Sequence, residues 1–328
     1  MKNIALLFIS FLCVAFLGGC QNVNEHYLLE EELGAYSFGF LFDVEMTEII
    51  RFVYNGEAIR IPYHVEGLAL TVISEIGWFL FVDGLPQRTH LETKEGEIFS
   101  ETSYIHNFAL SYHEKIEFYV VFTPISGEVG ETVTMVAGSV FRPEFMPDDI
   151  NDPIFGIFHA LSVGMPAEIE INSETVGSFT RDTSTQLQTI PQEILYEEQV
   201  RLPEGMGLDF ALAQFPRIGM FPHNSNIQLN YEGVIFAESG QAKVSLFVYG
   251  GQEVTSRITF FVNHQPVQVN DVDFIEVQME HGQMALVNIE LSLDEPDHLN
   301  ALYAVMMTID DDSLQRIFKT STLLLVNE

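Results

Sequence analysis

Short runs of β-branched and aromatic residues, separated by turn signals, recur along most of this chain. The clearest runs in the first half are residues 58–65, 68–73, 78–82, 105–112, 116–123 and 132–141. Among them lie Asn55-Gly56, Asp83-Gly84 and Ser126-Gly127, dipeptides that favour chain reversal. Such runs suit a pleated, half-buried surface, and no segment shows a long, well-capped 3.6-residue period. The pattern therefore predicts an antiparallel β-sandwich.

The final third of the chain repeats this plan. Its strand-like runs are residues 226–231, 234–237, 243–249, 258–262, 274–279, 285–293, 302–309 and 322–326. About eight short strands in roughly 120 residues suit a sandwich of immunoglobulin-like size. The sequence thus predicts an all-β protein with two tandem immunoglobulin-like antiparallel β-sandwich domains.

Three segments of the first half resemble segments of the second half, in the same order. The pairs are IRIPY at 59–63 with IQLNY at 227–231, FLFVDGLP at 79–86 with TFFVNHQP at 259–266, and YVVFT at 119–123 with YAVMMT at 303–308. The shared order and similar intervals favour an internal duplication. The alternative is two unrelated sandwiches that use the same turn chemistry at their hairpin ends.

The first twenty residues have a different composition. Lys2 precedes an apolar run at 4–16, which at about 13 residues is shorter than the roughly 20 that span a bilayer. The run ends at Leu17-Gly18-Gly19-Cys20, an aliphatic residue, two small residues and a cysteine. These features indicate an export signal. The alternative is an N-terminal helix or strand that stays buried in the fold.

This segment resembles the signal peptide and lipobox of bacterial lipoproteins. The resemblance implies that residues 1–19 are removed and that Cys20 carries a diacylglyceryl thioether as the new N-terminus. A diacylglyceryl group supplies two acyl chains, which is enough for stable anchoring. We therefore expect an extracytoplasmic protein that is lipid-anchored to the cell membrane or cell envelope, with the membrane as a partner through Cys20.

Cysteine usage and charge are consistent with export. Cys13 would leave with the signal and Cys20 would carry lipid, so the mature chain would keep no thiol, disulfide or cysteine metal site. The formal net charge is −33, from 47 acidic against 14 basic residues. This charge repels nucleic acid, which excludes nucleic acid as a partner. The acidity either keeps a surface protein soluble or favours cationic partners and Ca²⁺.

We divide the mature chain into four parts. They are a lipid-anchored tether at 20–35, a first sandwich at 36–145, a connecting region at 146–208 and a second sandwich at 209–328. The connecting region contains several prolines and a Ser/Thr/Gln-rich stretch. Because a structureless loop of this length is rare, we expect it to finish the first sandwich or to begin the second. Pro191 favours a helical start, which predicts one or two helical turns at 191–199.

Three acidic clusters are candidates for Ca²⁺, which takes about six to eight oxygen ligands. The strongest candidate, at the end of the first sandwich, consists of Asp148, Asp149, Asn151 and Asp152. The other two lie at 270–273 and 310–312, and none of the three has the spacing of an EF-hand loop. Solvated turns are the competing interpretation of all three clusters.

The sequence contains no motif of a common hydrolase or nucleotide-binding class, whether G-x-S-x-G, S-x-x-K, H-E-x-x-H or a glycine-rich phosphate loop. The histidines are scattered, and His113-Glu114 suits an exposed turn better than a metal site. Trp78 lies among apolar neighbours, which favours core packing over a sugar-binding platform.

These features predict a non-catalytic binding or structural module of the cell envelope, whose partner is an unknown envelope protein or glycan. The alternative is a hydrolase of envelope glycan or peptide with a site assembled from distant residues. A solute-binding lipoprotein is disfavoured because its strands would alternate with helices.

Overall fold

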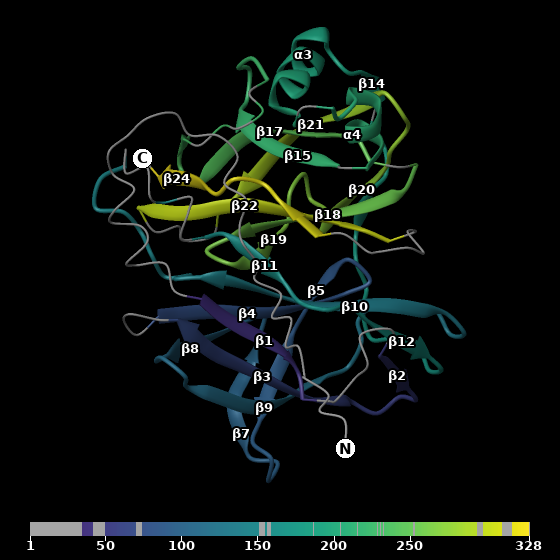
Figure 1. Cartoon of the computed structure of the whole chain (residues 1–328), viewed down its shortest axis with the longest axis vertical. Helices are drawn as coiled ribbons and strands as arrows, with labels where there is room; N and C mark the ends of the chain where they lie inside the picture. Colours follow the sequence, from purple (N-terminus) through teal and green to yellow (C-terminus); the bar gives the residue numbers. More distant parts are fainter. Residues whose placement is uncertain are drawn as a thin grey trace, which may run out of the picture.

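The fold is given by a computed structural model, drawn in Figure 1. The described residues are 35–41, 50–69, 74–150, 155, 159–185, 187–203, 205–214, 216–227, 229, 231, 233–251, 253–293, 298–309 and 317–327. Their strands form four sheets, named A to D here. The prediction of an all-β protein built from immunoglobulin-like antiparallel sandwiches is confirmed.

Sheets A and B make the first sandwich. Sheet A has the order β1 (Ala35–Phe40), β3 (Ile59–Ala69), β9 (Lys115–Phe122), β6 (Thr89–Glu92) and β7 (Ile98–Ser103). Sheet B has the order β2 (Arg51–Tyr54), β12 (Ala167–Ile171), β10 (Thr132–Phe141), β4 (Ser74–Val82) and β5 (Leu85–Gln87). Two short strands extend sheet B: β11 (Leu161–Val163) pairs with β10, and β8 (Ile105–Leu110) pairs with β4.

Sheets C and D make the second sandwich. Sheet C has the order β13 (Arg181–Asp182), β20 (Phe274–Gln278), β18 (Thr255–Val262), β22 (Leu299–Thr308), β24 (Leu323–Asn327) and β16 (Val234–Ala237). The strands β19 (Gln265–Val267) and β23 (Ile317–Lys319) pair with β18 and β22. Sheet D has the order β14 (Leu187–Thr189), β21 (Gln283–Ser292), β17 (Gln241–Tyr249) and β15 (Arg217–Pro222).

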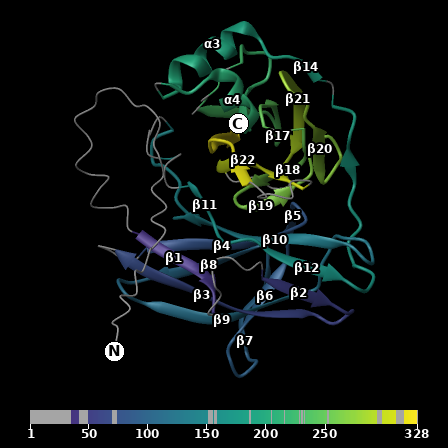
Figure 2. The ribbon, with the colours of Figure 1, turned by 45° about the vertical axis from the view of Figure 1, so that its right-hand side comes forward.

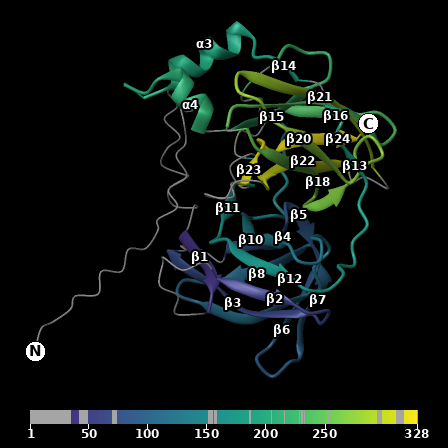
Figure 3. The ribbon, with the colours of Figure 1, turned by 90° about the vertical axis from the view of Figure 1, so that its right-hand side faces the viewer.

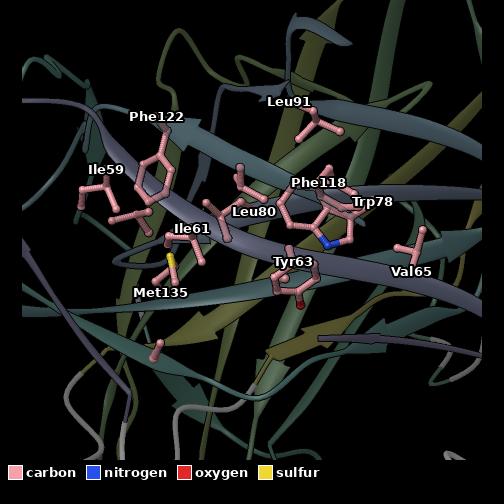
Figure 4. Close-up of a cluster of buried hydrophobic side chains, with 14 of the residues drawn as sticks. Ile59, Ile61, Tyr63, Val65, Trp78, Leu80, Leu91, Phe118, Phe122 and Met135 are labelled. Atoms are coloured by element: carbon pink, nitrogen blue, oxygen red, sulfur yellow. The ribbon is translucent and has the colours of Figure 1, made fainter. Parts of the chain in front are cut away.

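The core of the first sandwich is aromatic. The Trp78 side chain is fully buried between sheets A and B, as the sequence predicts, and Figure 4 shows it beside Tyr63 and Phe118. Ring centroids lie 5.3 Å from Trp78 to Tyr63 and 6.0 Å from Trp78 to Phe118, both in edge-on arrangements. Alternate residues of β4 contribute to this core because a strand presents every second side chain to the same face.

The two sandwiches pack against each other through sheets B and C. The residues of this second apolar layer are Phe79, Phe81, Val136 and Val140 from sheet B and Phe261, Tyr303, Val305 and Met307 from sheet C. The rings of Phe81 and Phe261 meet edge-on with centroids 6.1 Å apart. The central strands of both sheets are therefore buried on both faces, and the sheets stack in the order A, B, C, D (Figures 2 and 3).

Sheets B and C have the same topology. In chain order, β2, β4, β5, β10 and β12 occupy the positions that β16, β18, β19, β22 and β24 occupy in the second sandwich. In each sheet the edge strand pairs in parallel with the last strand, β2 with β12 and β16 with β24. This agreement supports the internal duplication.

Only one of the three sequence matches aligns equivalent strands. Residues 79–86 and 259–266 form the hairpins β4–β5 and β18–β19, which are equivalent. The match of 119–123 with 303–308 is wrong, because β9 lies in sheet A whereas β22 occupies the position of β10. The match of 59–63 with 227–231 is also wrong, because residues 59–63 lie in β3 whereas the described residues of 227–231 are not in a strand.

Each of the equivalent hairpins contacts the other sandwich with its turn. Asp83-Gly84 and Asn263-His264 both have positive φ angles, as a two-residue type I′ turn requires. From the second sandwich, Arg257 Nη1 donates to the backbone oxygen of Asp83 at 2.6 Å and to its Oδ2 at 2.5 Å. In the other direction, His264 Nε2 donates to the backbone oxygen of Pro143 at 2.8 Å. These bonds fix how the apolar faces meet.

The connecting region contributes to both sandwiches. Strands β11 and β12 belong to sheet B. Strand β13 belongs to sheet C, and strand β14 belongs to sheet D. The predicted helical turns are present as α3 (Gln192–Arg201), with Pro191 at its N-cap. Sequence reasoning did not find α4 (Leu208–Gln214), β15 or the β6–β7 hairpin. Within the described part of the chain, no helix is long and apolar enough to cross a membrane.

Both helices cover the outer face of sheet D, at the end of the stack farthest from sheet A (Figure 1). Ile194 of α3 and Leu212 of α4 pack with Phe247 and Tyr249, the outward-facing residues of β17. The Tyr249 hydroxyl donates to Glu198 Oε1 at 2.9 Å, and Arg217 Nη2 lies 3.3 Å from Glu198 Oε2. The buried carboxylate of α3 is thereby paired.

Candidate functional site

The predicted anchor lies outside the described residues. This applies to Cys20 and to the lipobox residues Leu17, Gly18 and Gly19, so lipidation stays a prediction.

The predicted calcium cluster is only partly described. Asp148 and Asp149 lie exposed in a bend after β10, whereas Asn151 and Asp152 fall outside the described residues. Among the residues that the structure describes, no group of three or more His, Cys, Asp or Glu side chains is arranged to hold a metal ion. Calcium binding at this cluster therefore stays a prediction.

The acidic loop at 270–273 has a structural role. Asp273 Oδ2 accepts hydrogen bonds from the backbone N–H of Thr180 at 2.7 Å and from its hydroxyl at 2.8 Å, and Oδ1 accepts from Gln268 at 3.0 Å. Burial raises the pKa of Asp273, but these hydrogen bonds outweigh it, and the pKa lies below its ordinary value. The loop ties the connection between the sandwiches to β20. The cluster at 310–312 lies outside the described residues.

One serine and histidine pair has the geometry that the hydrolase alternative requires. His106 Nδ1 lies 2.8 Å from Ser100 Oγ, while its Nε2 lies 3.1 Å from the backbone oxygen of Thr89 and 2.8 Å from its hydroxyl. Burial lowers the pKa of His106 to about 4. So weak a base is poorly suited to take a proton from serine at neutral pH. The pair is better explained as a clamp that holds the β6–β7 hairpin against β8.

A groove opens at one side of the second sandwich. It has a volume of about 550 Å³ and lies between the turn after β15, the strand β16 and the start of β17. Its lining residues are Pro222, His223, Asn224, Val234, Ile235, Phe236, Glu238, Gln241 and Lys243. The groove exists because β15 ends at Pro222, which pairs with Val244, and leaves the first residues of β17 uncovered on that side. Proline ends the ladder because it has no N–H to donate.

The groove combines an aromatic surface with polar groups. Phe236 is 52% exposed, although its neighbours Ile235 and Ala237 are buried. Lys243 Nζ is paired with Glu290 Oε1 at 2.6 Å, which compensates its charge. Glu238 is exposed at the end of β16, where its backbone N–H donates to Gln241 O at 2.9 Å. Such a mixture suits non-covalent binding, and we take this groove as the candidate site.

A buried polar cluster at the contact between the sandwiches is a second unusual feature. His264 Nε2–H donates a hydrogen bond to the Pro143 backbone oxygen, so the neutral ring has its acceptor at Nδ1. Nδ1 accepts a hydrogen bond from the Tyr303 hydroxyl at 2.9 Å. The ring of His159 stacks on His264 with centroids 5.2 Å apart. On the Tyr303 ring, Lys319 Nζ lies 4.6 Å from the centroid.

Burial perturbs every titratable group of this cluster. It lowers the pKa of His264 to about 4, and burial together with the nearby His264 and Lys319 lowers that of His159 to about 3. The pKa of Lys319 falls to about 7 for the same reason. His264 bonds to both sandwiches, so the cluster joins them and is not arranged as an open ligand site.

The groove and the polar cluster were both missed from the sequence. The only local signal for the groove is an uncharged strand, VIFA at 234–237, next to turn residues. The cluster has no local signal, because His264 and Pro143 are 121 positions apart.

Comparisons with known proteins do not assign the chain to a family. No protein-family model matches the chain, and no curated protein matches it. A chaperone–tip adhesion subunit pre-assembly complex from Csu pili of Acinetobacter baumannii is 10% identical, with a TM-score of 0.21 over 87% of this chain and 98% of that chain. The C-terminal domain of the Streptococcus agalactiae AgI/II polypeptide BspA is 6% identical, with a TM-score of 0.22 over 89% of this chain and 100% of that chain. A marsupial T cell receptor is 7% identical, with a TM-score of 0.20 over 90% of this chain and 74% of that chain. Scores this low carry no argument about function.

Proposed function

We propose that this chain is a membrane-anchored, extracytoplasmic lipoprotein that serves as a non-catalytic binding module of the cell envelope. The Leu17-Gly18-Gly19-Cys20 sequence after a short apolar run supports the anchor. In the mature protein, a diacylglyceryl group on Cys20 holds the chain to the membrane, and residues 21–34 connect it to β1.

The apolar contact between sheets B and C carries the proposal of a binding role. It joins the two sandwiches into one stack, so the groove beside β16 has a fixed position relative to the strand through which the tether enters. The tether enters through sheet A, and the groove lies in the second sandwich, beyond sheet B. The stack therefore separates the groove from β1, the strand that follows the tether.

The anchor is tested by metabolic labelling with an alkyne analogue of palmitate, followed by membrane fractionation. We expect label in the wild-type chain and none in Cys20→Ala, which should leave the membrane fraction. Cys13→Ala is the matched control, because this cysteine lies within the apolar run and should not affect labelling. Unlabelled wild-type protein in the cytosol would refute the anchor.

The hydrolase alternative is favoured most by the hydrogen bond between Ser100 and His106, which at 2.8 Å is shorter than the 3.5 Å contact between Ser245 and His223. A fluorophosphonate probe distinguishes the two functions, because it modifies an activated serine and ignores an ordinary one. We expect no labelling of Ser100. Labelling that disappears in both Ser100→Ala and His106→Gln would establish the hydrolase instead.

A further inference from the structure

The groove is bordered by a sheet edge whose strand contains no charged residue and no proline. Strand β16 is the last strand in the order of sheet C, and its sequence VIFA has neither a charged residue nor a proline. Proteins usually protect exposed edges with charge, proline or a covering segment, because unpaired peptide groups are a template for another strand. Within the described residues, no other strand pairs with this edge.

The register of β16 shows which peptide groups face outward. The strand pairs in parallel with β24, Ile235 opposite Leu325, and the backbone N–H of Leu324 donates to Gly233 O at 3.1 Å. A parallel ladder uses the peptide groups of alternate residues on each side. The peptide groups of Val234 and Phe236 therefore point to the outer edge, where the groove begins. The Val234 oxygen already accepts a hydrogen bond from the Tyr231 hydroxyl at 3.0 Å, which leaves the Val234 N–H and the peptide groups of Phe236 for a further strand.

The equivalent edge of the first sandwich provides a contrast. Strand β2 has the sequence RFVY, and its Arg51 forms an ion pair with Glu168 of β12 at 2.5 Å. By register, Val53 of β2 corresponds to Phe236 of β16, and the two side chains are similarly exposed, at 48% and 52%. The first edge thus carries a cation, and the pocket of about 550 Å³ lies at the second.

Charge determines what kind of chain can occupy this edge. The chain has a net charge of −33, so a second copy would be repelled. Of the charged residues in the groove, Lys243 is already paired with Glu290, while Glu238 lies exposed where β16 ends. An incoming segment therefore meets the exposed carboxylate of Glu238 and an aromatic surface at Phe236.

From these observations we infer that the outer edge of β16 receives an extended, basic segment of a partner protein, which adds to sheet C as a further strand. The inference rests on the proposed binding function and specifies the class of partner. Backbone hydrogen bonds to the Val234 N–H and to the N–H and C=O of Phe236 supply the affinity. Alternate side chains of the segment contact Phe236 and Pro222, and a lysine or arginine pairs with Glu238.

The test uses full-length protein in neutral detergent and a fluorescent peptide of alternating valine and lysine, read by fluorescence anisotropy. Two control probes are a valine–glutamate peptide of the same length and a valine–lysine peptide N-methylated at every residue. The N-methylated probe keeps its charge but loses the N–H groups of both edges. We expect binding of the unmodified basic probe and at least about tenfold weaker binding of both control probes.

Variants locate the binding edge. Phe236→Lys places a cation on β16 and should weaken binding of the basic probe at least about tenfold, whereas Val53→Lys on β2 should change it less than about twofold. Glu238→Gln should weaken binding about threefold and reduce its salt dependence. Circular dichroism melting of each variant verifies that it is folded.

Three outcomes would overturn the inference: no binding of the basic probe, equal binding of the N-methylated probe, or equal weakening by Val53→Lys and Phe236→Lys. None of them bears on palmitate labelling at Cys20, so failure of this inference is distinguishable from failure of the anchor.

Discussion

Acidification should weaken the junction between the sandwiches through His264. This side chain is 5% exposed and bonds to Tyr303 and to the Pro143 oxygen, so the folded protein holds it neutral. Its pKa falls from 6.5 to about 4 on folding because burial disfavours the charged ring. Since the folded pKa is the lower one, the stability contribution is complete above pH 6.5 and is lost as the pH falls toward 4.

The size of the effect follows from proton linkage. At pH 5 the unfolded histidine is almost fully protonated, whereas the folded one is still mostly neutral. The free energy of unfolding should therefore fall by about 2 kcal/mol between pH 7.5 and pH 5 on account of His264. Replacing His264 by Gln removes this contribution. The variant will be less stable at pH 7.5, but its deficit relative to wild type should shrink by about 2 kcal/mol at pH 5.

Urea unfolding at both pH values, followed by circular dichroism, measures this difference. His281→Gln is the control, because that histidine is exposed in the turn before β21 and its replacement should leave the pH dependence unchanged. Trp78 fluorescence reports separately on the first sandwich, since this is the only tryptophan in the chain. A His264→Gln variant with the same pH dependence as wild type would refute the assigned role.

Three further predictions concern packing, charge and metal. Phe81→Ala should lower the free energy of unfolding by about 3 to 5 kcal/mol, because it leaves a cavity between sheets B and C. Phe210→Ala, at a 57% exposed position, should lower it by only about 0.5 kcal/mol. Equal losses for the two variants in thermal unfolding would contradict the apolar junction. Arg257→Met should cost about 2 kcal/mol, because it leaves the half-buried Asp83 without its cation and removes one of the two cations that pair with Glu276, the other being Arg181. Lys243→Met, which breaks an exposed pair, should cost less than about 0.5 kcal/mol in the same urea assay. If the cluster from Asp148 to Asp152 binds Ca²⁺, a chelator should lower the melting temperature of the wild-type protein. It should not change the melting temperature of an Asp148→Asn, Asp149→Asn double variant. An unchanged wild-type melting temperature would exclude a tight stabilising site.

Strand chemistry made the fold class predictable from the sequence. Turn dipeptides and β-branched runs located most strands, and the Asp83-Gly84 and Asn263-His264 turns identified the equivalent hairpins. The β6–β7 hairpin was missed because Thr89–Ser103 is mostly polar and lacks the apolar alternation on which strand prediction relies.

Two strand sequences indicate the stacking of the two sandwiches. Strands β10 and β22 are apolar on consecutive residues, where a strand with one solvated face would alternate. Such runs indicate burial on both faces, and here the second face is covered by the other sandwich. Which residues meet across it could not be derived, because pairs such as Asp83 and Arg257 lie 174 positions apart.

The candidate site was less predictable for a physical reason. Edge strands differ from central strands in what pairs with them, and local composition does not show whether a neighbour is present. The sequence therefore placed 234–237 correctly as a strand without revealing that one edge of it borders a groove. Acidic clusters were the more visible feature, yet in the loop at 270–273 the Asp273 carboxylate bonds to Thr180 and Gln268, and Asn270 bonds to β21.

Mass spectrometry of the N-terminal peptide of protein purified from membranes tests the anchored, exported state most directly. We predict a peptide that begins at Cys20 and carries the mass of a diacylglyceryl group, with no peptide from residues 1–19. A peptide that retains the apolar run and contains an unmodified Cys20 would contradict it.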